Sequence, residues 1–339
     1  MTLHAIYHFK IPAHVPLDGT IAFSDLATAT GLDEDRLTRI LRYAMLNHIF
    51  TEPTPGQVAH SAVSRLLTPG TNDIDFLGHS TEDVWPGCLA QVQALKNKIP
   101  SQASPDSGVM VALGGGNKNT LFEVFEAEPA RVKRFGNAMA ATNAPGGFAS
   151  VDKLLMGFDW QSLGKAKVVD VGGSLGATAI AVLQSAKQLT KVIVQDLPEV
   201  IEEATSRPVP LGLEDRLEFQ KASFLEPQPI KDADLYYFRF IFHDWPTDKC
   251  IEILKNLVPS MKRGSRLLMN DFFLYPNDAI HDADVSYSRV ARAADLQMMV
   301  AFNARERSLR ELEEMVESAV PGELILESSR ELVVVFRKL

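Results

Sequence analysis

The sequence predicts an α/β fold with a mostly parallel sheet in residues 151–339, and three observations carry this prediction. The apolar run 167–171 ends in a glycine-rich turn, and a helix-forming segment follows. A second apolar run ends in Asp196, twenty residues after Gly176. Only glycine lets the backbone turn sharply and approach a ligand closely, and nucleotide-binding α/β folds place a carboxylate on the ribose at about this distance. We therefore expect a nucleoside-containing ligand.

The glycine turn indicates which nucleoside binds. Its pattern over residues 170–176 is Asp-x-Gly-Gly-x-x-Gly, which is neither a phosphate-binding loop nor the Gly-x-Gly-x-x-Gly of a dinucleotide site. Asp170 precedes the glycines and suits a cationic ligand better than a pyrophosphate. S-adenosylmethionine carries a sulfonium, an ammonium and a ribose, so it fits. The alternative is a turn that serves only strand–helix packing, and the placement of Asp196 argues against it.

Strand-like and helix-like segments alternate through the rest of this region. The last two strand-like segments are separated only by Ser329 and Arg330, so they must pair antiparallel. Five parallel strands closed by such a hairpin form the Rossmann-like seven-stranded sheet of class I methyltransferases, and ordinary dinucleotide folds lack the reversed strand. The predicted strands are 167–171, 191–196, 216–223, 233–240, 265–274, 323–328 and 331–338.

The first half of the chain predicts helices. Residues 1–75 form a winged-helix-like unit, with a helix that Asp33 opens and a hairpin at 51–60. Basic residues are few on this second helix, so DNA binding is disfavoured. Residues 76–150 are expected to be a helical connecting region, with a loop at 98–119.

Composition excludes several classes of protein. The 339 residues suit two domains or slightly more, and a net charge of −9 without a basic patch argues against a nucleic-acid partner. Two lone cysteines, Cys88 and Cys250, argue for a reducing compartment and against a disulfide scaffold or a zinc site, and we predict no metal. No run of apolar residues is long enough to span a membrane, and the first residues do not form a secretion signal. These features predict a cytoplasmic enzyme.

His243 is the candidate catalytic residue. It follows the predicted strand 233–240, at the sheet edge where open α/β sheets bind ligands. Asp244 is placed to cap the helix that comes next. A neutral imidazole here can take the proton of a phenol or enol hydroxyl as the oxygen attacks a methyl sulfonium. The ring needs an orienting carboxylate, and Asp271 and Glu306 are the candidates. The plainer alternative is a histidine that merely packs in a loop.

Four segments in order give the chain a specific resemblance. They are AKVVDVGGSLG, VIVQDLPEV, YYFRFIFHDWPTDKCIEILKNL and ADLQMMVAFNARERS. Together they resemble the fungal secondary-metabolite O-methyltransferases, relatives of the plant caffeate and flavonoid O-methyltransferases. The resemblance covers nearly the whole chain. It implies a homodimer formed through the N-terminal domain 1–75, a substrate-pocket region 76–150, and a catalytic domain 151–339 that binds S-adenosylmethionine and releases S-adenosylhomocysteine.

The resemblance also implies roles for individual residues. His243 matches the general base, Glu306 matches the acidic residue that orients it, and Asp271 stands where plant members have glutamate. Arg239 stands where plant members use lysine near the cofactor. The implied cofactor site comprises Asp170, Gly172, Gly173, Gly176, Asp196, Leu197, Ser223, Phe224 and Arg239. The implied substrate pocket comprises Met298, Met299, Phe302 and Asn303, although a methionine stripe is also typical of plain core.

Two departures from the family pattern bear on function. Ser223 stands where the family has an acidic residue, and losing a charge-assisted hydrogen bond there costs roughly 1.5–3 kcal/mol. The sequence also begins at a point that lies inside the N-terminal domain of family members, which puts part of the dimer contact in doubt.

The leading prediction is O-methylation of a small aromatic or polyketide-derived secondary metabolite. The alternative from another reaction class is a pericyclase of the same fold that catalyses dehydration, Diels–Alder or Alder-ene steps. Ser223 and the basic residues Arg239, Arg289 and Arg292 leave room for it, whereas the set of His243, Asp271 and Glu306 favours methyl transfer. A pure binding role is the third possibility, because fold alone does not choose among them.

Overall fold

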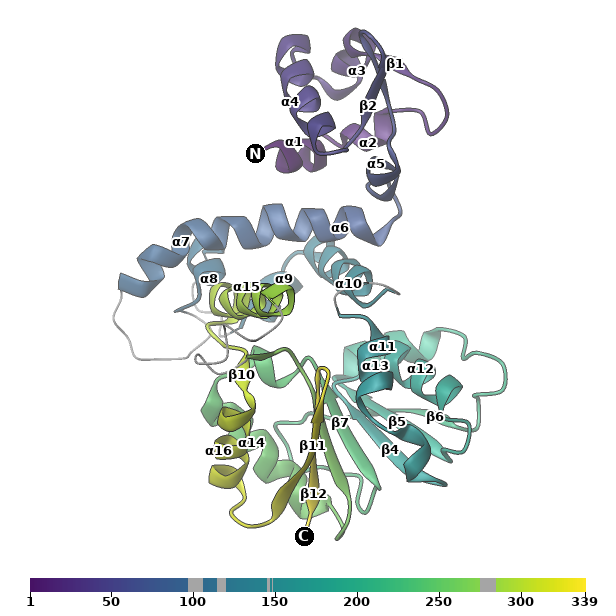
Figure 1. The fold of residues 1–339 in the computed structure, drawn as a ribbon, viewed down its shortest axis with the longest axis vertical. Helices are drawn as coiled ribbons and strands as arrows, with labels where there is room; N and C mark the ends of the chain where they lie inside the picture. The colour runs from purple at the N-terminus through teal and green to yellow at the C-terminus, as the bar shows by residue number, and fades with distance from the viewer. Residues whose placement is uncertain (97–105, 115–119, 145–146, 148, 275–284) are drawn as a thin grey trace. The chain divides into compact units, whose positions relative to one another are not determined.

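The computed structural model describes residues 1–96, 106–114, 120–144, 147, 149–274 and 285–339 (Figure 1). The chain forms two compact units. An amino-terminal unit contains 1–98 and 107–148, and a carboxyl-terminal unit contains 99–106 and 149–339. No helix within the described ranges is long and apolar enough to cross a membrane.

The first part of the amino-terminal unit is a small helical bundle with a wing. Asp33 caps α4 by accepting the N–H of Arg36, and Gly31 ends α3 with φ +71°, as helix ends require. The hairpin expected at 51–60 is present as β2 and β3. The elements are α1 (Thr2–His8), α2 (Ile11–His14), β1 (Ile21–Ala22), α3 (Phe23–Thr30), α4 (Glu34–Leu46), β2 (Thr51–Thr54), β3 (Gln57–Ala59) and α5 (Ala62–Leu66).

The rest of this unit consists of helices, and one of them corrects a prediction. We expected a loop over 98–119, but Gly108–Leu113 is the helix α8, which Ser107 caps; residues 97–105 and 115–119 lie outside the described residues. The helices are α6 (Asn72–Gly78), the π-helical segment η1 (His79–Val84), α7 (Trp85–Lys96), α8 (Gly108–Leu113), α9 (Leu121–Glu126) and α10 (Pro129–Asn143).

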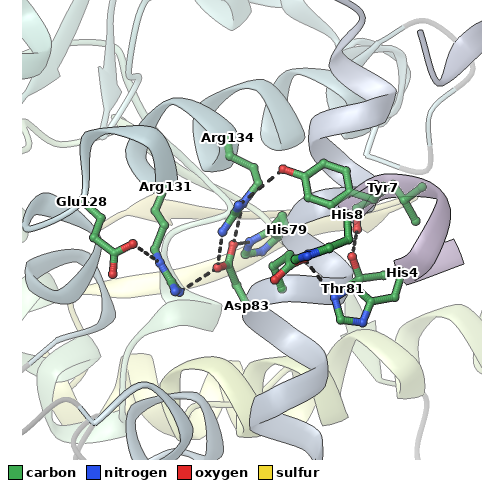
Figure 2. Close-up of polar contacts among 11 residues, drawn as sticks. His4, Tyr7, His8, His79, Thr81, Asp83, Glu128, Arg131 and Arg134 are labelled. Atoms are coloured by element: carbon green, nitrogen blue, oxygen red, sulfur yellow. Dashed lines mark hydrogen bonds and ion pairs between the residues drawn. The ribbon is translucent and has the colours of Figure 1, made fainter. Parts of the chain in front are cut away.

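A buried carboxylate holds α10 against η1 (Figure 2). The Asp83 side chain is 1% exposed and accepts from Arg131 Nη1 at 2.9 Å and from Arg134 Nε at 3.1 Å. His79 Nδ1 lies 3.1 Å from the same carboxylate. A buried charge is tolerated only when it is paired in this way, so the network fixes the packing of these helices.

The carboxyl-terminal unit contains the predicted seven-stranded sheet. Its strand order is β11-β12-β8-β7-β4-β5-β6, and β12 pairs antiparallel with both of its neighbours. The five strands from β6 to β8 pair in parallel. The strands are β4 (Lys167–Val171), β5 (Lys191–Asp196), β6 (Leu217–Lys221), β7 (Leu235–Arg239), β8 (Arg266–Asn270), β11 (Leu324–Arg330) and β12 (Val333–Lys338).

Alternate residues of the central strands fill two apolar layers. Val169 and Phe238 belong to the layer that α14 and α16 cover, whereas Val168 and Tyr237 belong to the layer under α11 and α12. Strands buried on both faces are continuously apolar, which is why the sequence predicts them well. The helices of this unit are α11 (Val151–Gly157), η3 (Trp160–Leu163), α12 (Ala177–Ser185), α13 (Pro198–Ser206), η4 (Phe242–Asp244), α14 (Thr247–Leu257), η5 (Val258–Ser260), α15 (Val285–Phe302) and α16 (Leu309–Ala319).

Three local expectations need correction. The predicted strand 265–274 is interrupted, because β8 ends at Asn270 and the short β9 (Phe273–Leu274) pairs instead with β10 (Arg307–Ser308). The final hairpin turns at 331–332, two residues later than expected. Asp244 does not cap α14; Pro246 occupies that position, and Asp244 belongs to the preceding turn η4.

Candidate active site

The glycine turn after β4 is tightly packed. Gly172 has φ +75°, and a Cβ there would lie 2.6 Å from the side chain of Ile241. Gly172 and Gly173 donate their N–H groups to the carbonyl of Gln195 at 2.8 and 3.1 Å. Gly176 has φ +81°, and a Cβ there would lie 2.9 Å from Phe219. A side chain at Gly172 is therefore excluded both by conformation and by space.

Asp196 joins the loops after β4 and β5. Its two carboxylate oxygens accept the N–H groups of Ser174 and Leu197, each at 2.8 Å. Burial raises the pKa of the carboxyl, and these bonds lower it in part. Each oxygen keeps a second lone pair, so the carboxylate is fixed in place and still able to accept from ligand hydroxyls. Leu197 is 50% exposed beside it.

A buried carboxyl lies under the same turn. Asp170 is 2% exposed, and its Oδ2 has no hydrogen-bond partner among the described residues. Burial raises its pKa to about 7. Arg239, from the neighbouring strand β7, stacks over the ring of Phe240 at 4.8 Å and donates to the carbonyl of Ala149. The orphaned carboxylate oxygen and the glycine cradle fit a ligand that carries positive charge and a ribose.

Of the remaining predicted cofactor residues, Phe224 lies close to the turn. Phe224 is in edge-to-face contact with Trp245, with 5.8 Å between ring centroids, and it borders the space above Gly172. Ser223 accepts the N–H of Leu225 at 3.2 Å, so its hydroxyl serves the local turn. The residue that departs from the family pattern thus has a role in the backbone of its own loop.

His243 lies in η4, just after β7, with a carboxylate on its ring. Its Nδ1 is 2.8 Å from Oε1 of Glu306, whose side chain is fully buried. The His243 side chain is 12% exposed, and its Nε2 lies 3.5 Å from Oδ1 of Asp244. A carboxylate on Nδ1 fixes the tautomer that carries its proton there and leaves Nε2 to accept a proton. Chemically, a ring held this way can exchange a proton at Nε2.

Charge around the ring decides its protonation. Burial lowers the pKa of His243, but the charges of Glu306, Asp244 and Asp271 outweigh it and raise this pKa to about 10. Burial raises the pKa of Asp271 to about 7 and that of Asp244 to about 6, because their negative charges are desolvated and crowded.

The two predicted orienting carboxylates therefore differ. Glu306 bonds the ring, whereas Asp271 acts on it only through its charge; Oδ1 of Asp271 is buried without a hydrogen-bond partner within the described part of the chain. Sequence reasoning missed Asp244 as a neighbour of Nε2, since it assigned that side chain to a helix cap. In the sequence, Asp244 fits a helix cap as well as it fits the site. The structure decides between the two, because Pro246 is the N-cap residue of α14.

Two other residues that sequence reasoning missed hold this arrangement in place. Asp295, on α15, accepts the N–H of Glu306 at 3.0 Å. Arg307 is 5% exposed and donates to the carbonyls of Phe242 and Trp245, at 2.7 and 2.9 Å. These carbonyls flank His243. No local pattern predicts such contacts, because their partners are separated in the chain by as many as 65 residues.

The predicted substrate residues lie on or just after α15. Met298 and Phe302 are buried, and Met299 and Asn303 are half-buried. This helix packs against η4, the turn that carries His243. Arg289 is exposed and Arg292 is half-buried on the same helix. The structure thus brings the predicted pocket residues and the candidate base to neighbouring elements of one unit.

Comparison with known families gives two matches. Residues 108–320 match the O-methyltransferase domain, and residues 1–70 match the O-methyltransferase dimerisation domain. Two fungal relatives cover 94% of the chain. The grayanic acid biosynthesis cluster O-methyltransferase of Cladonia grayi is 37% identical, and the O-methyltransferase AMT9 of Alternaria alternata is 34% identical. The chain spans 66% and 73% of the lengths of these two relatives.

Solved structures share the fold over the whole chain. The mitomycin 7-O-methyltransferase MmcR has a TM-score of 0.80 at 23% identity, and the match covers 93% of that chain. LepI in complex with SAH and a substrate analogue has a TM-score of 0.81 at 23% identity, and the match covers 85% of that chain. Given the matched domains, the fungal relatives and the glycine turn, the chain belongs to the family of S-adenosylmethionine-dependent O-methyltransferases.

Proposed function

We propose that this protein methylates a hydroxyl of a small aromatic or polyketide-derived secondary metabolite, with His243 as general base. The observation that carries the proposal is the 2.8 Å contact between His243 Nδ1 and the buried Glu306. A ring held this way at the carboxyl-terminal edge of the sheet serves proton transfer. A purely structural histidine does not need a fully buried charge on one of its ring nitrogens.

The residues of the glycine turn and its neighbours would hold the cofactor. Asp196 would accept from the ribose hydroxyls, with Leu197 and Phe224 beside the adenine. Gly172 would let the backbone approach the methionine part, and the Asp170 carboxylate below it favours positive charge. When bound, S-adenosylmethionine supplies an electrophilic methyl group.

The proton of the acceptor hydroxyl would move to Nε2 of His243. Glu306 accepts a hydrogen bond from Nδ1–H and compensates the imidazolium charge that develops, so the ring need not move during transfer. The raised pKa of His243, about 10, is close to that of a phenol. Proton transfer between groups of similar pKa is efficient, and it removes the positive charge that the acceptor oxygen would otherwise gain.

The relatives and the pocket residues bear on the substrate class. Both cited relatives are fungal O-methyltransferases, and one is named for grayanic acid biosynthesis, which favours a secondary metabolite. The apolar residues Met298 and Phe302 suit a flat, mostly apolar acceptor. We infer that residues 1–75 pair with a second copy of the chain, that 76–150 line the pocket, and that 151–339 carry the catalytic site.

The test combines cofactor binding with product analysis. Calorimetric titration with S-adenosylmethionine and S-adenosylhomocysteine is followed by mass spectrometry of a phenolic and polyketide panel incubated with S-adenosylmethionine. We expect both cofactor forms to bind and one acceptor to gain the mass of a methylene unit.

The His243→Ala variant should bind S-adenosylmethionine normally and lose methyl transfer by about 10²–10⁴-fold. His14→Ala, at an exposed histidine of α2 in the amino-terminal unit, is the control and should behave as the unaltered protein. Normal turnover by His243→Ala would contradict the proposal. So would a product that is isomeric with its substrate or one water lighter, which would identify a pericyclase instead.

A further inference from the structure

Two histidines and a glutamate converge on the surface of the amino-terminal unit. His4 and His8 lie one turn apart on α1, and both point toward η1 (Figure 2). His4 Nε2 is 2.9 Å and His8 Nδ1 is 3.1 Å from the same oxygen, Oε1 of Glu82. One potential ligand atom from each residue lies within 4.8 Å of the other two. Glu82 is 78 positions from His4 and 74 positions from His8 in the chain, and the fold brings the three side chains together.

Other contacts fix this geometry independently of the three side chains. Tyr7, between the two histidines, packs its ring against Gly78, where any Cβ would lie 2.3 Å from the ring. The Tyr7 hydroxyl accepts from Arg134, which in turn binds the buried Asp83. The backbone of α1 is therefore docked on the start of η1 by packing and by a buried ion network. The backbone positions of the three residues are thus held near one another by contacts other than the bonds among their side chains.

The spacing and chemistry suit a divalent transition metal. Histidines at i and i+4 of a helix present their rings on one face, and two imidazoles with one carboxylate form a common zinc ligand set. Metal–ligand bonds of about 2.0–2.1 Å in a tetrahedron place ligand atoms about 3.3 Å apart. The two observed separations from the glutamate oxygen, 2.9 and 3.1 Å, need only a small expansion to reach this.

Exposure and charge around the three residues support the same occupant. The side chains of His4, His8 and Glu82 are 42%, 61% and 28% exposed, so an ion can enter and a water can complete its coordination. Trp85 lies edge-on to His4, with 6.5 Å between ring centroids, and covers one side. Two neutral imidazoles and one carboxylate carry a total charge of −1. A bound dication would therefore leave one net positive charge near the surface.

We propose that His4, His8 and Glu82 form a zinc site that fastens α1 to η1. This inference is independent of the methyl-transfer proposal, because the three residues belong to the amino-terminal unit and His243 belongs to the other. The two lone cysteines predicted no metal, and the sequence does not reveal this cluster because Glu82 is remote from both histidines in the chain. The site would have a structural role: it would fix the first helix of the region that matches the dimerisation domain.

The test is calorimetric titration of the metal-free protein with Zn²⁺. The background is Cys88→Ser, because an exposed thiol three residues after Trp85 is a competing zinc ligand. We expect one ion per chain. His4→Ala, His8→Ala and Glu82→Gln should each weaken binding by at least about tenfold, since even outer-shell changes at metal sites cost about 10–100-fold. His14→Gln, an exposed histidine of α2 outside the cluster, is the matched control and should bind as the background does.

Thermal unfolding provides the second measurement. Zn²⁺ should raise the midpoint of unfolding of the background protein and of His14→Gln, and it should leave the midpoint of His8→Ala unchanged. Two results would overturn the proposal. One is the absence of any binding up to about 100 μM Zn²⁺, an affinity too weak for a structural site. The other is stoichiometric binding that survives all three substitutions, which would locate the ion elsewhere.

Discussion

At the scale of single residues, the charge of His243 is set by the carboxyl groups around it. Glu306 and Asp244 raise the pKa of the ring to about 10, although burial opposes them. The ring is therefore an imidazolium at neutral pH, and it must lose its proton before it can act as a base. The raised pKa has a compensating effect, because the neutral ring is then a stronger base toward a phenol.

Asp196 offers a test of the cofactor site at the same scale. In Asp196→Asn one of the two backbone N–H donors, of Ser174 or Leu197, would face an amide NH₂ instead of an oxygen. The ribose would also lose a charged acceptor. We expect the dissociation constant for S-adenosylmethionine to rise about 10- to 150-fold, from a loss of roughly 1.5–3 kcal/mol, as measured by calorimetry.

Asp159→Asn is the matched control for this variant. Asp159 also accepts two backbone N–H groups, those of Gln161 and Ser162, but it caps the short helix η3. Because asparagine caps a helix about as well as aspartate, this substitution should change stability little and leave cofactor affinity unchanged. Equal affinity losses in Asp196→Asn and Asp159→Asn would mean that Asp196 acts only through its turn.

At the scale of secondary structure, the turn η4 depends on an element far away in the sequence. Arg307 begins β10, which pairs in parallel with β9, so this small ladder holds the segments that follow Asp271 and Glu306. The guanidinium of Arg307 donates to the carbonyls of Phe242 and Trp245, which lie on either side of His243 in the chain. Arg307 is thus a positioning residue, and its bidentate fork has no equivalent in lysine.

The variant Arg307→Lys tests whether Arg307 positions His243 without contributing to the binding of S-adenosylmethionine. A single ammonium cannot satisfy both carbonyls in the same geometry, so the turn and its histidine shift. We expect kcat to fall by about 10- to 10²-fold while the affinity for S-adenosylmethionine stays within about twofold, because small misplacements of a reacting group have large effects on rate. Arg310→Lys, at an exposed arginine of α16, is the control. A cofactor affinity that falls in parallel with kcat would argue for a general loss of structure.

At the scale of the whole molecule, the sequence predicts the sheet better than it predicts the contacts of the site. Strands such as β4 and β5 are buried on both faces, so their local composition reveals them. The helix α8 was missed because it is short and because it lies in a segment rich in glycine, proline and serine. Local composition favoured a loop there, and packing against α7 overrides it.

Some residues of the site can likewise be predicted from the sequence, whereas the contacts of others cannot. Asp170 lies near the end of β4, Gly172 directly follows that strand, and Asp196 ends β5, so their positions at the sheet edge can be predicted from the fold. The contacts of Glu306, Asp295 and Arg307 depend on how α15 and β10 return to η4, and no periodicity encodes that return. The resemblance to a known family identified Glu306, which the local pattern alone left as one of two candidates.

The buried carboxyls should make the whole molecule less stable at high pH. The pKa of Asp271 in the folded state, about 7, exceeds its ordinary value of 3.8, so folding favours the protonated form. Stability from this group is fully present below about pH 4 and is lost as pH rises through 7. Asp271→Asn should therefore raise the free energy of unfolding at pH 8 by about 1–4 kcal/mol, with little gain at pH 4, in denaturant titrations.

The control for this effect is Asp18→Asn, since the Asp18 side chain is 98% exposed. It should change stability at neither pH by more than about 0.5 kcal/mol. A loss of stability in Asp271→Asn at pH 8 would mean that the carboxylate is held by favourable contacts. In that case burial would not destabilise the charge of Asp271.

The most direct test of the central claim is the pH dependence of kcat/KM for methyl transfer, compared between the unaltered protein and Glu306→Gln with the same acceptor. Glu306 raises the pKa of His243, so kcat/KM of the unaltered protein should climb from pH 7 toward 10 as the ring loses its proton. In Glu306→Gln the climb should move to lower pH and reach a lower plateau, by about 10²-fold, while the exposed control Glu314→Gln keeps the original profile. An unchanged profile in Glu306→Gln would contradict the assignment of His243, oriented by Glu306, as the base.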